Sequence, residues 1–134
     1  MTTDGFLVAA TALHLGFQAA VTALVYPALA VVPEQRWAVE HSRHSRRITP
    51  VVALVYGSLV LAGAGVLLGG PSPLEVAAVL ASGGAVLVTA AAAAPLHARL
   101  AGGPDPVLLR RLLVADRWRC ALAATAAVLA LIST

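Results

Sequence analysis

Four long apolar runs, separated by short polar breaks, constrain this chain more than any other feature. A transmembrane α-helix needs about 20 consecutive, mostly apolar residues. The composition agrees, because 60% of the 134 residues are hydrophobic and only 11% are charged, against about 25% charged in an average soluble domain. We therefore expect an all-α protein, with residues 1–134 forming a single integral membrane domain. The expected spans are residues 5–32, 48–69, 74–95 and 108–132.

The breaks between the runs predict an antiparallel four-helix bundle. Pro33 and Glu34 follow the first run, and clusters of glycine and proline at residues 69–73 and 102–106 follow the second and third. Such clusters end helices, and short connections place consecutive helices side by side. The first run has no basic residue before it and is longer than the apolar part of a signal peptide, so we expect it to be a retained helix.

The arginines predict how the bundle is oriented. Four of the nine lie in the first connection and five lie around the third, whereas the termini and the middle connection carry none. Because cytoplasmic loops are rich in Lys and Arg, we expect both basic connections in the cytoplasm and both termini outside the cell membrane. The apolar background makes lipid phosphate, and not nucleic acid, the expected partner. The side chains expected to contact lipid headgroups are Arg36, Arg43, Arg46, Arg47, Arg110 and Arg111.

The amphipathic segment of residues 34–47 sorts its histidines and arginines onto opposite faces of a helix. At 100° per residue, Trp37, His41, His44 and Ile48 fall within an arc of about 60°. An electrostatic membrane anchor needs only the arginine face. Two histidines three residues apart can share a metal ion or flank a substrate, or can lie at the membrane interface bonded to carbonyls or headgroups. Trp37 is expected as an interface anchor, with a substrate contact as the alternative.

Polar residues recur at every fourth position of the first run, at His14, Gln18, Thr22 and Tyr26. Polar side chains in a span usually face the bundle interior. They predict either hydrogen bonds between helices or a polar lining in which Gln18 and Tyr26 contact a substrate. His14 lies about 18 Å outward of Tyr26 along the helix axis, too far to share a ligand with histidines at the inner end.

Topology brings His97 and Asp116 to the same membrane face as His41 and His44. Histidines with a carboxylate suit metal ligation, orientation of an imidazole, or proton transfer. The candidate catalytic residues are therefore these four, and the three histidines are also candidate metal ligands. The alternative for Asp116 is an ion pair, either with Arg119 three residues later or with an arginine of the first connection. No HExxH, P-loop, GxGxxG or CxxC motif is present, so metal and haem stay open and neither is required.

The two halves of the chain look alike. Each has an apolar span with a proline near its inner end, Pro27 or Pro95, then an arginine-rich amphipathic stretch and another span. Paired hairpin repeats are common in membrane bundles, so an internal repeat of two hairpins is one interpretation. The other is that similar inner ends demand similar residues.

The chain resembles a small four-helix membrane family that includes anthrone oxygenases. The resemblance rests on YPAL (26–29), the Trp/His/Arg-rich segment that opens the second helix, APLHARL (94–100) and DRWR (116–119). It implies a tetraspan protein, in some members one that oxidises aromatic polyketide-like substrates. Ala94 and His97 stand where members often have asparagine. The residues that match the family pattern are Pro95, Leu96, Asp116, Trp118 and Arg119.

Three functions follow from these patterns. The first is an oxygenase-like or redox enzyme that handles a lipophilic substrate in a cytoplasmic-side His/Asp pocket. The second is a non-enzymatic subunit that binds haem or a metal or supports a membrane complex. The third is a small transporter subunit, which would need a homo-oligomer. Convergent histidines beside a cavity favour the first, histidines at the headgroups the second, and a polar track to both faces the third.

Overall fold

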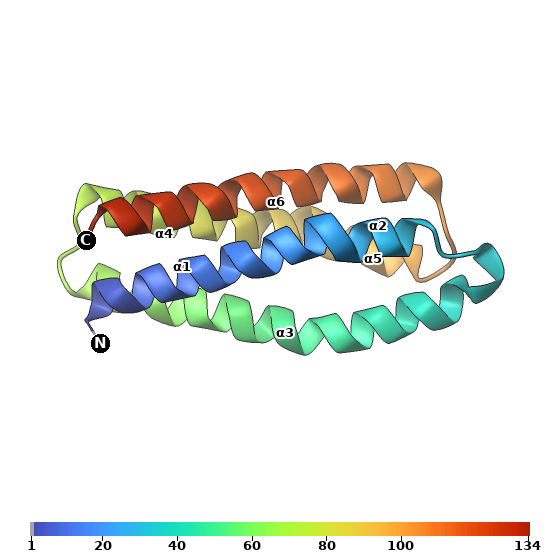
Figure 1. The fold of residues 1–134 in the computed structure, drawn as a ribbon, viewed down its shortest axis with the longest axis horizontal. Coiled ribbons are helices and arrows are strands. Elements are labelled where there is room, and N and C mark those ends of the chain that lie inside the picture. The colour runs from blue at the N-terminus through green and yellow to red at the C-terminus, as the bar shows by residue number, and fades with distance from the viewer. Residues whose placement is uncertain (1) are drawn as a thin grey trace.

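The computed structural model describes residues 2–134, which form four continuous helices in an up-down bundle and no strand (Figure 1). The all-α prediction is confirmed. Both termini lie at one end of the bundle, here called the terminal end, and the connections at residues 31–33 and 101–105 lie at the other, here called the connection end. In order, the helices are α1 (Thr3–Ala20) with η1 (Val21–Val25) and α2 (Tyr26–Ala30), then α3 (Glu34–Leu68), then α4 (Pro73–Val88) with η2 (Thr89–Ala93) and α5 (Ala94–Leu100), and finally α6 (Pro106–Ile132).

Three of these helices are long and apolar enough to cross a membrane: Thr3–Ala30, Glu34–Leu68 and Pro73–Leu100. The fourth, α6, has the predicted length, but five charged side chains lie in its first half, at Arg110, Arg111, Asp116, Arg117 and Arg119. By length and composition the described residues thus contain three candidate spans, and the fourth stays a prediction.

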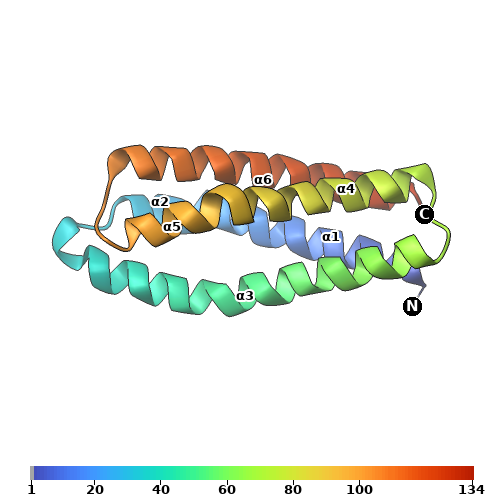
Figure 2. The same cartoon turned by 180° about the vertical axis from the view of Figure 1, so that it is seen from behind.

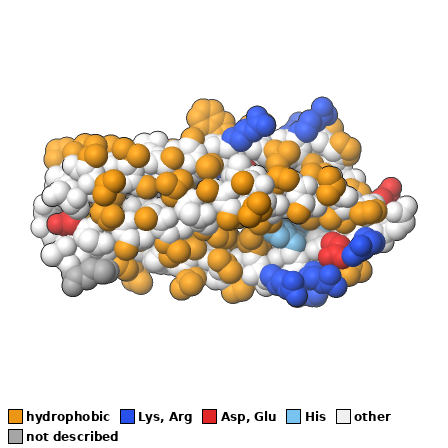
Figure 3. All heavy atoms as spheres, viewed as in Figure 1, with side chains coloured by type: hydrophobic (Ala, Val, Ile, Leu, Met, Phe, Trp, Pro, Cys, Tyr) orange, Lys and Arg blue, Asp and Glu red, His pale blue; other side chains and the backbone are white. Residues whose placement is uncertain are grey.

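The bundle buries several polar side chains and leaves many large apolar side chains exposed. His14 and Gln18 have no exposed surface and Asp116 is 1% exposed, whereas Leu54 and Leu80 on the outer faces are 69% and 70% exposed. Hydrophobic side chains cover much of the face seen in Figure 3. A soluble bundle would bury its large aliphatic side chains. The observed distribution is the one that lipid contact favours, since polar groups in a membrane helix turn toward the protein interior.

The first and third helices each contain one wide π-helical turn at the same step before a proline. The turn η1 begins six residues before Pro27, and η2 begins six residues before Pro95. Proline lacks a backbone N–H and its ring clashes with the carbonyl four residues earlier, and a π-bulge is one way in which a helix absorbs such a disruption. The extra residue in η1 also keeps Thr22 and Tyr26 on the inner face, where four-residue steps of an α-helix would drift by about 40° each.

Small residues set the packing of the helices. The largest helix contact is that of α4 with α6, and alanines of both helices have no exposed surface. Small side chains allow backbones to approach closely in a membrane, where no hydrophobic force acts between helices. By contrast, α3 passes through Pro50 without a break and bows outward from the other helices (Figures 1 and 2). The His-bearing segment is therefore part of the same continuous helix as the apolar run that follows it.

Candidate functional site

A cavity of about 610 Å³ lies in the connection half of the bundle, between α3 and the helix formed by α4, η2 and α5. Most of its wall is apolar and comes from Phe17, Val21, Ile48, Val52 and the alanines of α5. Exposed small residues of α3 and α5 line its edge, so the cavity opens sideways between these two helices. Its volume and its apolar lining with a few polar groups are those of a small-molecule site.

Three histidines meet at one wall of this cavity. The Nε2 atom of His41 lies 3.4 Å from Nδ1 of His97, and the rings of His44 and His97 stack with their centroids 5.7 Å apart. All three line the cavity, and Figure 3 shows a histidine side chain reaching the surface beside arginine side chains. The structure thus brings together the three histidines that the sequence placed at one end of the bundle.

Tyr26 connects the histidines to the centre of the bundle. Its hydroxyl lies 3.1 Å from Nε2 of His97 and accepts a hydrogen bond of 3.5 Å from Nη1 of Arg119. Both ring nitrogens of His97 are therefore engaged, one by Tyr26 and one by His41. The result is a continuous polar chain that runs from Arg119 through Tyr26 and His97 to His41, along the wall of an otherwise apolar cavity.

Asp116 does not contact the histidines. Its carboxylate accepts hydrogen bonds from the Gln18 amide and from the Thr22 hydroxyl, the latter at 2.7 Å. It lies 3.8 Å from Nη1 of Arg119, so the ion pair considered from the three-residue spacing is the one that forms, in place of a pair with an arginine of α3. Asp116 reaches His97 only through Arg119 and Tyr26, and it supports the site instead of lining the cavity.

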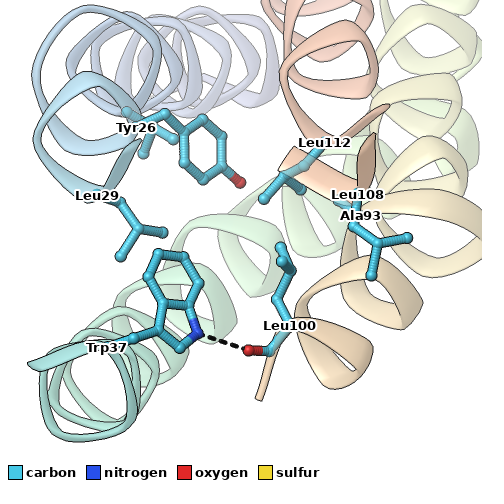
Figure 4. Close-up of a cluster of buried hydrophobic side chains, with 8 residues drawn as sticks. Tyr26, Leu29, Trp37, Ala93, Leu100, Leu108 and Leu112 are labelled. Atoms are coloured by element: carbon cyan, nitrogen blue, oxygen red, sulfur yellow. Dashed lines mark hydrogen bonds between the residues drawn. The ribbon is translucent and has the colours of Figure 1, made fainter. Parts of the chain in front are cut away.

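Trp37 is buried inside the bundle and does not face outward as an interface anchor would, which corrects the prediction from the sequence. It is 2% exposed, its Nε1–H donates to the carbonyl of Leu100 at 2.8 Å, and its ring stacks on that of His41. Figure 4 shows the indole among Leu29, Leu100 and the neighbouring apolar side chains, where it fills the space between α3 and α5. Trp37 therefore supports His41, and it does not line the cavity.

Gln18 also supports the site from behind. Its side chain is fully buried and donates to Asp116, so it does not line the cavity, where a substrate contact was predicted. His14 lies apart from the other histidines, as its depth predicted. Its ring meets that of Tyr56 edge-on, with 5.5 Å between centroids. Of the polar residues of the first helix, Tyr26 is the one that reaches the cavity wall.

The histidine cluster is not built as a metal site. Within residues 2–134, no group of three His, Cys, Asp or Glu side chains is placed to hold a metal ion. The rings of His44 and His97 stack on each other instead of pointing their nitrogens at one centre. Haem iron held between His41 and His97 would need their nitrogens about 4 Å apart, with bonds of about 2 Å on each side, and they are 3.4 Å apart. The predicted ligand set is therefore not assembled here.

The face opposite the histidines is charged, as the helical arc predicted. Arg36 and Arg43 both pair with Glu40, at 2.6 and 3.0 Å, and Arg47 is exposed on the same side. Exposed ion pairs of this kind add little stability, so these arginines can exchange Glu40 for other negative charges at small cost. The six arginines predicted to contact headgroups, Arg36, Arg43, Arg46, Arg47, Arg110 and Arg111, are all exposed.

Arg119 is a candidate site residue that the distribution of arginines along the sequence did not single out. In the sequence it is one of five arginines around the third connection, yet its side chain is 3% exposed and lines the cavity. Helical periodicity could have predicted its burial, because Arg119 lies about one turn after Asp116 and therefore on the same inward face of α6. Arg110, Arg111 and Arg117 face outward.

No protein-family model, characterised protein or solved structure matches the chain. Its function must therefore be inferred from the fold and the site themselves. Together they define a helical-bundle protein with three helices long and apolar enough to cross a membrane. Its lateral cavity is lined mainly by apolar side chains and carries three histidines, a tyrosine and a buried arginine on its wall.

Proposed function

We propose that this protein is a four-span membrane enzyme that admits a lipophilic small molecule from the inner leaflet and performs acid–base chemistry on it. The observation that carries the proposal is the polar chain from Arg119 through Tyr26 and His97 to His41 at the wall of an apolar cavity. Apolar walls hold the carbon skeleton of such a ligand, and convergent polar groups orient and activate its reactive part.

The placement in the bilayer rests on helix length and charge. The 35 residues of α3 extend about 52 Å, against a hydrocarbon core of about 30 Å. We place the surplus in residues 34–47, whose arginines then meet the cytoplasmic headgroups, with both termini outside. In α6, Asp116 and Arg119 are buried, so the lipid would meet mainly its apolar second half, and α6 would serve as the fourth span.

The chemistry rests on the two engaged nitrogens of His97. A histidine that contacts Tyr26 on one side and His41 on the other can accept a proton at one nitrogen while the other releases one, which is the arrangement of a relay. The polar chain ends at His41, near the beginning of α3 and the aqueous side. A substrate in the cavity that has an acidic C–H or O–H would give its proton to the Tyr26 oxygen while the Tyr26 hydroxyl proton moves to Nε2 of His97. The proton on Nδ1 of His97 would then move to Nε2 of His41, toward the cytoplasm.

The resemblance to the anthrone-oxygenase-containing family suggests the test substrate. Purified protein in lipid nanodiscs is given 1,8-dihydroxyanthrone in air, and the appearance of the anthraquinone is followed by its absorbance. In the balanced reaction one O2 is consumed per anthrone, one oxygen atom becomes the new carbonyl and the other leaves as water, so an oxygen electrode gives an independent count.

The variants locate the chemistry. We expect His97→Gln to lower kcat by about 10²- to 10⁴-fold, the usual contribution of a general acid–base group, and Tyr26→Phe to lower it less. The control is His14→Gln, which alters a buried histidine outside the site, compared at equal helicity by circular dichroism. Its kcat should match that of the wild type. A wild-type protein with no turnover, or a His97→Gln variant as active as the wild type, contradicts the proposal.

Transport has less support from the same structure. The buried polar residues of the first helix stop at Thr11, and nearer the terminal end the interior is closed by Leu7, Leu59 and Val66. A polar track to both faces, which transport would require, is therefore interrupted by an apolar layer. The haem-binding subunit is disfavoured by the short distance between His41 and His97.

A further inference from the structure

Arg119 is a buried cation with fewer partners than its chemistry demands. Its side chain is 3% exposed and lines the cavity. A guanidinium carries five N–H donors, yet here it makes only two long hydrogen bonds, of 3.5 Å to Tyr26 and 3.4 Å to Tyr56. Its buried Nε has no partner in the described chain. Buried donors are nearly always satisfied in native proteins, so Arg119 has capacity for one more acceptor.

The nearby carboxylate does not supply that acceptor. Asp116 lies 3.8 Å from Nη1 of Arg119, beyond hydrogen-bonding distance, and its oxygens already accept from Gln18 and Thr22. The residues that line the cavity include no Asp or Glu, and their other arginine, Arg46, lies on the exposed side of α3. The lining of the cavity therefore contributes the Arg119 cation and no carboxylate, and the acceptors within hydrogen-bonding reach of Arg119 are the two tyrosine hydroxyls at 3.4 and 3.5 Å.

We propose that Arg119, together with the Tyr26 hydroxyl, binds an anionic oxygen of the ligand, and that the ligand is a compact lipophilic phenol or enol. Figure 4 shows the Tyr26 hydroxyl pointing from its helix toward the interior of the bundle. The apolar walls suit an aromatic skeleton, and hydrogen bonds from an ionised donor to an ionised oxygen are stronger than neutral ones. This inference rests on the proposed function for its cavity, and it names the substrate class of that site.

The two assignments fit together chemically. When a proton leaves an enolisable ketone or a phenol, the negative charge collects on oxygen. A fixed cation in a site that excludes water stabilises such a charge far better than bulk solvent does. Arg119 would hold the oxygen while His97 and His41 carry the proton away, so binding and proton transfer use neighbouring parts of one polar chain.

Binding alone tests the inference. The probe is 1,8-dihydroxyanthraquinone, which is already oxidised, compared with its dimethyl ether, which cannot ionise. Binding to nanodisc-embedded protein is followed by quenching of tryptophan fluorescence, and the ionised probe is identified by its red-shifted absorbance. We expect the ionised probe to bind at least about tenfold more tightly than the ether, as a hydrogen bond to a charged group implies. The ionisation midpoint of the bound probe should then fall by about one pH unit.

The variants distinguish the loss of the Arg119 charge from a loss of the folded structure. Arg119→Gln should abolish the preference for the ionised probe. The double variant Asp116→Asn with Arg119→Gln should do the same. It removes both buried charges together, so that no unpaired buried charge is left to cause misfolding. Arg117→Gln, an exposed arginine two residues away, should behave as the wild type. If Arg119→Gln and the double variant keep the preference, or if the wild type binds both probes equally, the anion site is overturned while the cavity stands.

Three further outcomes are distinct. If the wild type binds neither probe, both the cavity function and the anion site fail. If the ionised probe binds selectively but no anthrone is converted, the proposed chemistry fails and the anion site stands. Dodecanoate serves as a competitor, and its displacing the probe at equal concentration would assign the site to a fatty-acid carboxylate and overturn the phenol assignment.

Discussion

The two ends of the bundle are packed in different ways. In the terminal half, small residues such as Gly63, Ala78 and Ala130 let the helices touch directly around Leu7 and Leu59. In the connection half, α3 bows outward and a cavity remains between it and α5. The polar contacts that join these two helices there are the hydrogen bond from Trp37 to Leu100 and the contact of His41 with His97. Close contact thus holds one half together, whereas a large side chain holds the other half open around the site.

The largest effect is expected at Trp37. Trp37→Ala removes a buried indole and its hydrogen bond, and such truncations cost about 3–5 kcal/mol. Trp37→Phe keeps a ring but loses the donor to Leu100, for which we expect about 1 kcal/mol. The measurement is the free energy of unfolding from titration with SDS in mixed micelles, followed by circular dichroism.

Trp118 provides the matched control, because it is the other tryptophan and is 64% exposed. Trp118→Ala should change the free energy of unfolding by less than about 0.5 kcal/mol. If the two alanine variants lose equal stability, Trp37 is not what holds the connection half together.

An intermediate effect is expected when a side chain is enlarged. Ala123 on α6 has no exposed surface, so Ala123→Leu should cost about 1–3 kcal/mol through overpacking. Ala98 on α5 is exposed at the edge of the cavity. Ala98→Leu should leave the free energy of unfolding nearly unchanged but weaken binding of the anthraquinone probe. If Ala98→Leu is instead the more destabilising change, the assignment of tight and open halves is reversed.

The smallest effect compares two glycines of α3. A Cβ at Gly63 would lie 3.3 Å from Cγ1 of Val79, whereas nothing lies within 4 Å of one at Gly57. Gly57→Ala should stabilise the protein by up to about 1 kcal/mol through helix propensity, and Gly63→Ala should gain less or lose slightly. Thermal unfolding of both variants in one detergent resolves the difference, and equal gains would show that the α3–α4 contact tolerates a methyl group.

Much of the fold was predictable because helical periodicity is simple arithmetic. Hydrophobic runs and proline or glycine breaks located all four helices, and the 100° rule placed Trp37, His41 and His44 on the face opposite Arg43 and Arg47. The meeting of His41 with His97 also follows from topology, because both lie at the connection end. These conclusions need only the backbone and the order of the elements.

The rest depended on side-chain packing that a helical arc does not contain. Trp37 could equally have faced lipid, and the space between Leu29 and Leu100 that it fills exists only once α3 and α5 are in place. The π-helical turns leave no clear signal before the structure is known, although Pro27 and Pro95 mark where they occur. Arg119 was considered as a possible ion-pair partner of Asp116 and not as a cavity residue, because a count of arginines does not separate this buried side chain from the exposed Arg117.

The matched π-turns give the site a built-in asymmetry. Tyr26 and Ala94 each directly precede one of the two prolines, and Leu29 and His97 each lie two residues after one. If the two hairpins had the same residues at these positions, Tyr26 would face a leucine or His97 would face an alanine, and the contact between the tyrosine and the histidine would be lost. Because the halves differ at both positions, each contributes one member of an unlike pair. Neither hairpin contains the pair alone, so this polar contact at the cavity wall exists only when the two hairpins pack against each other.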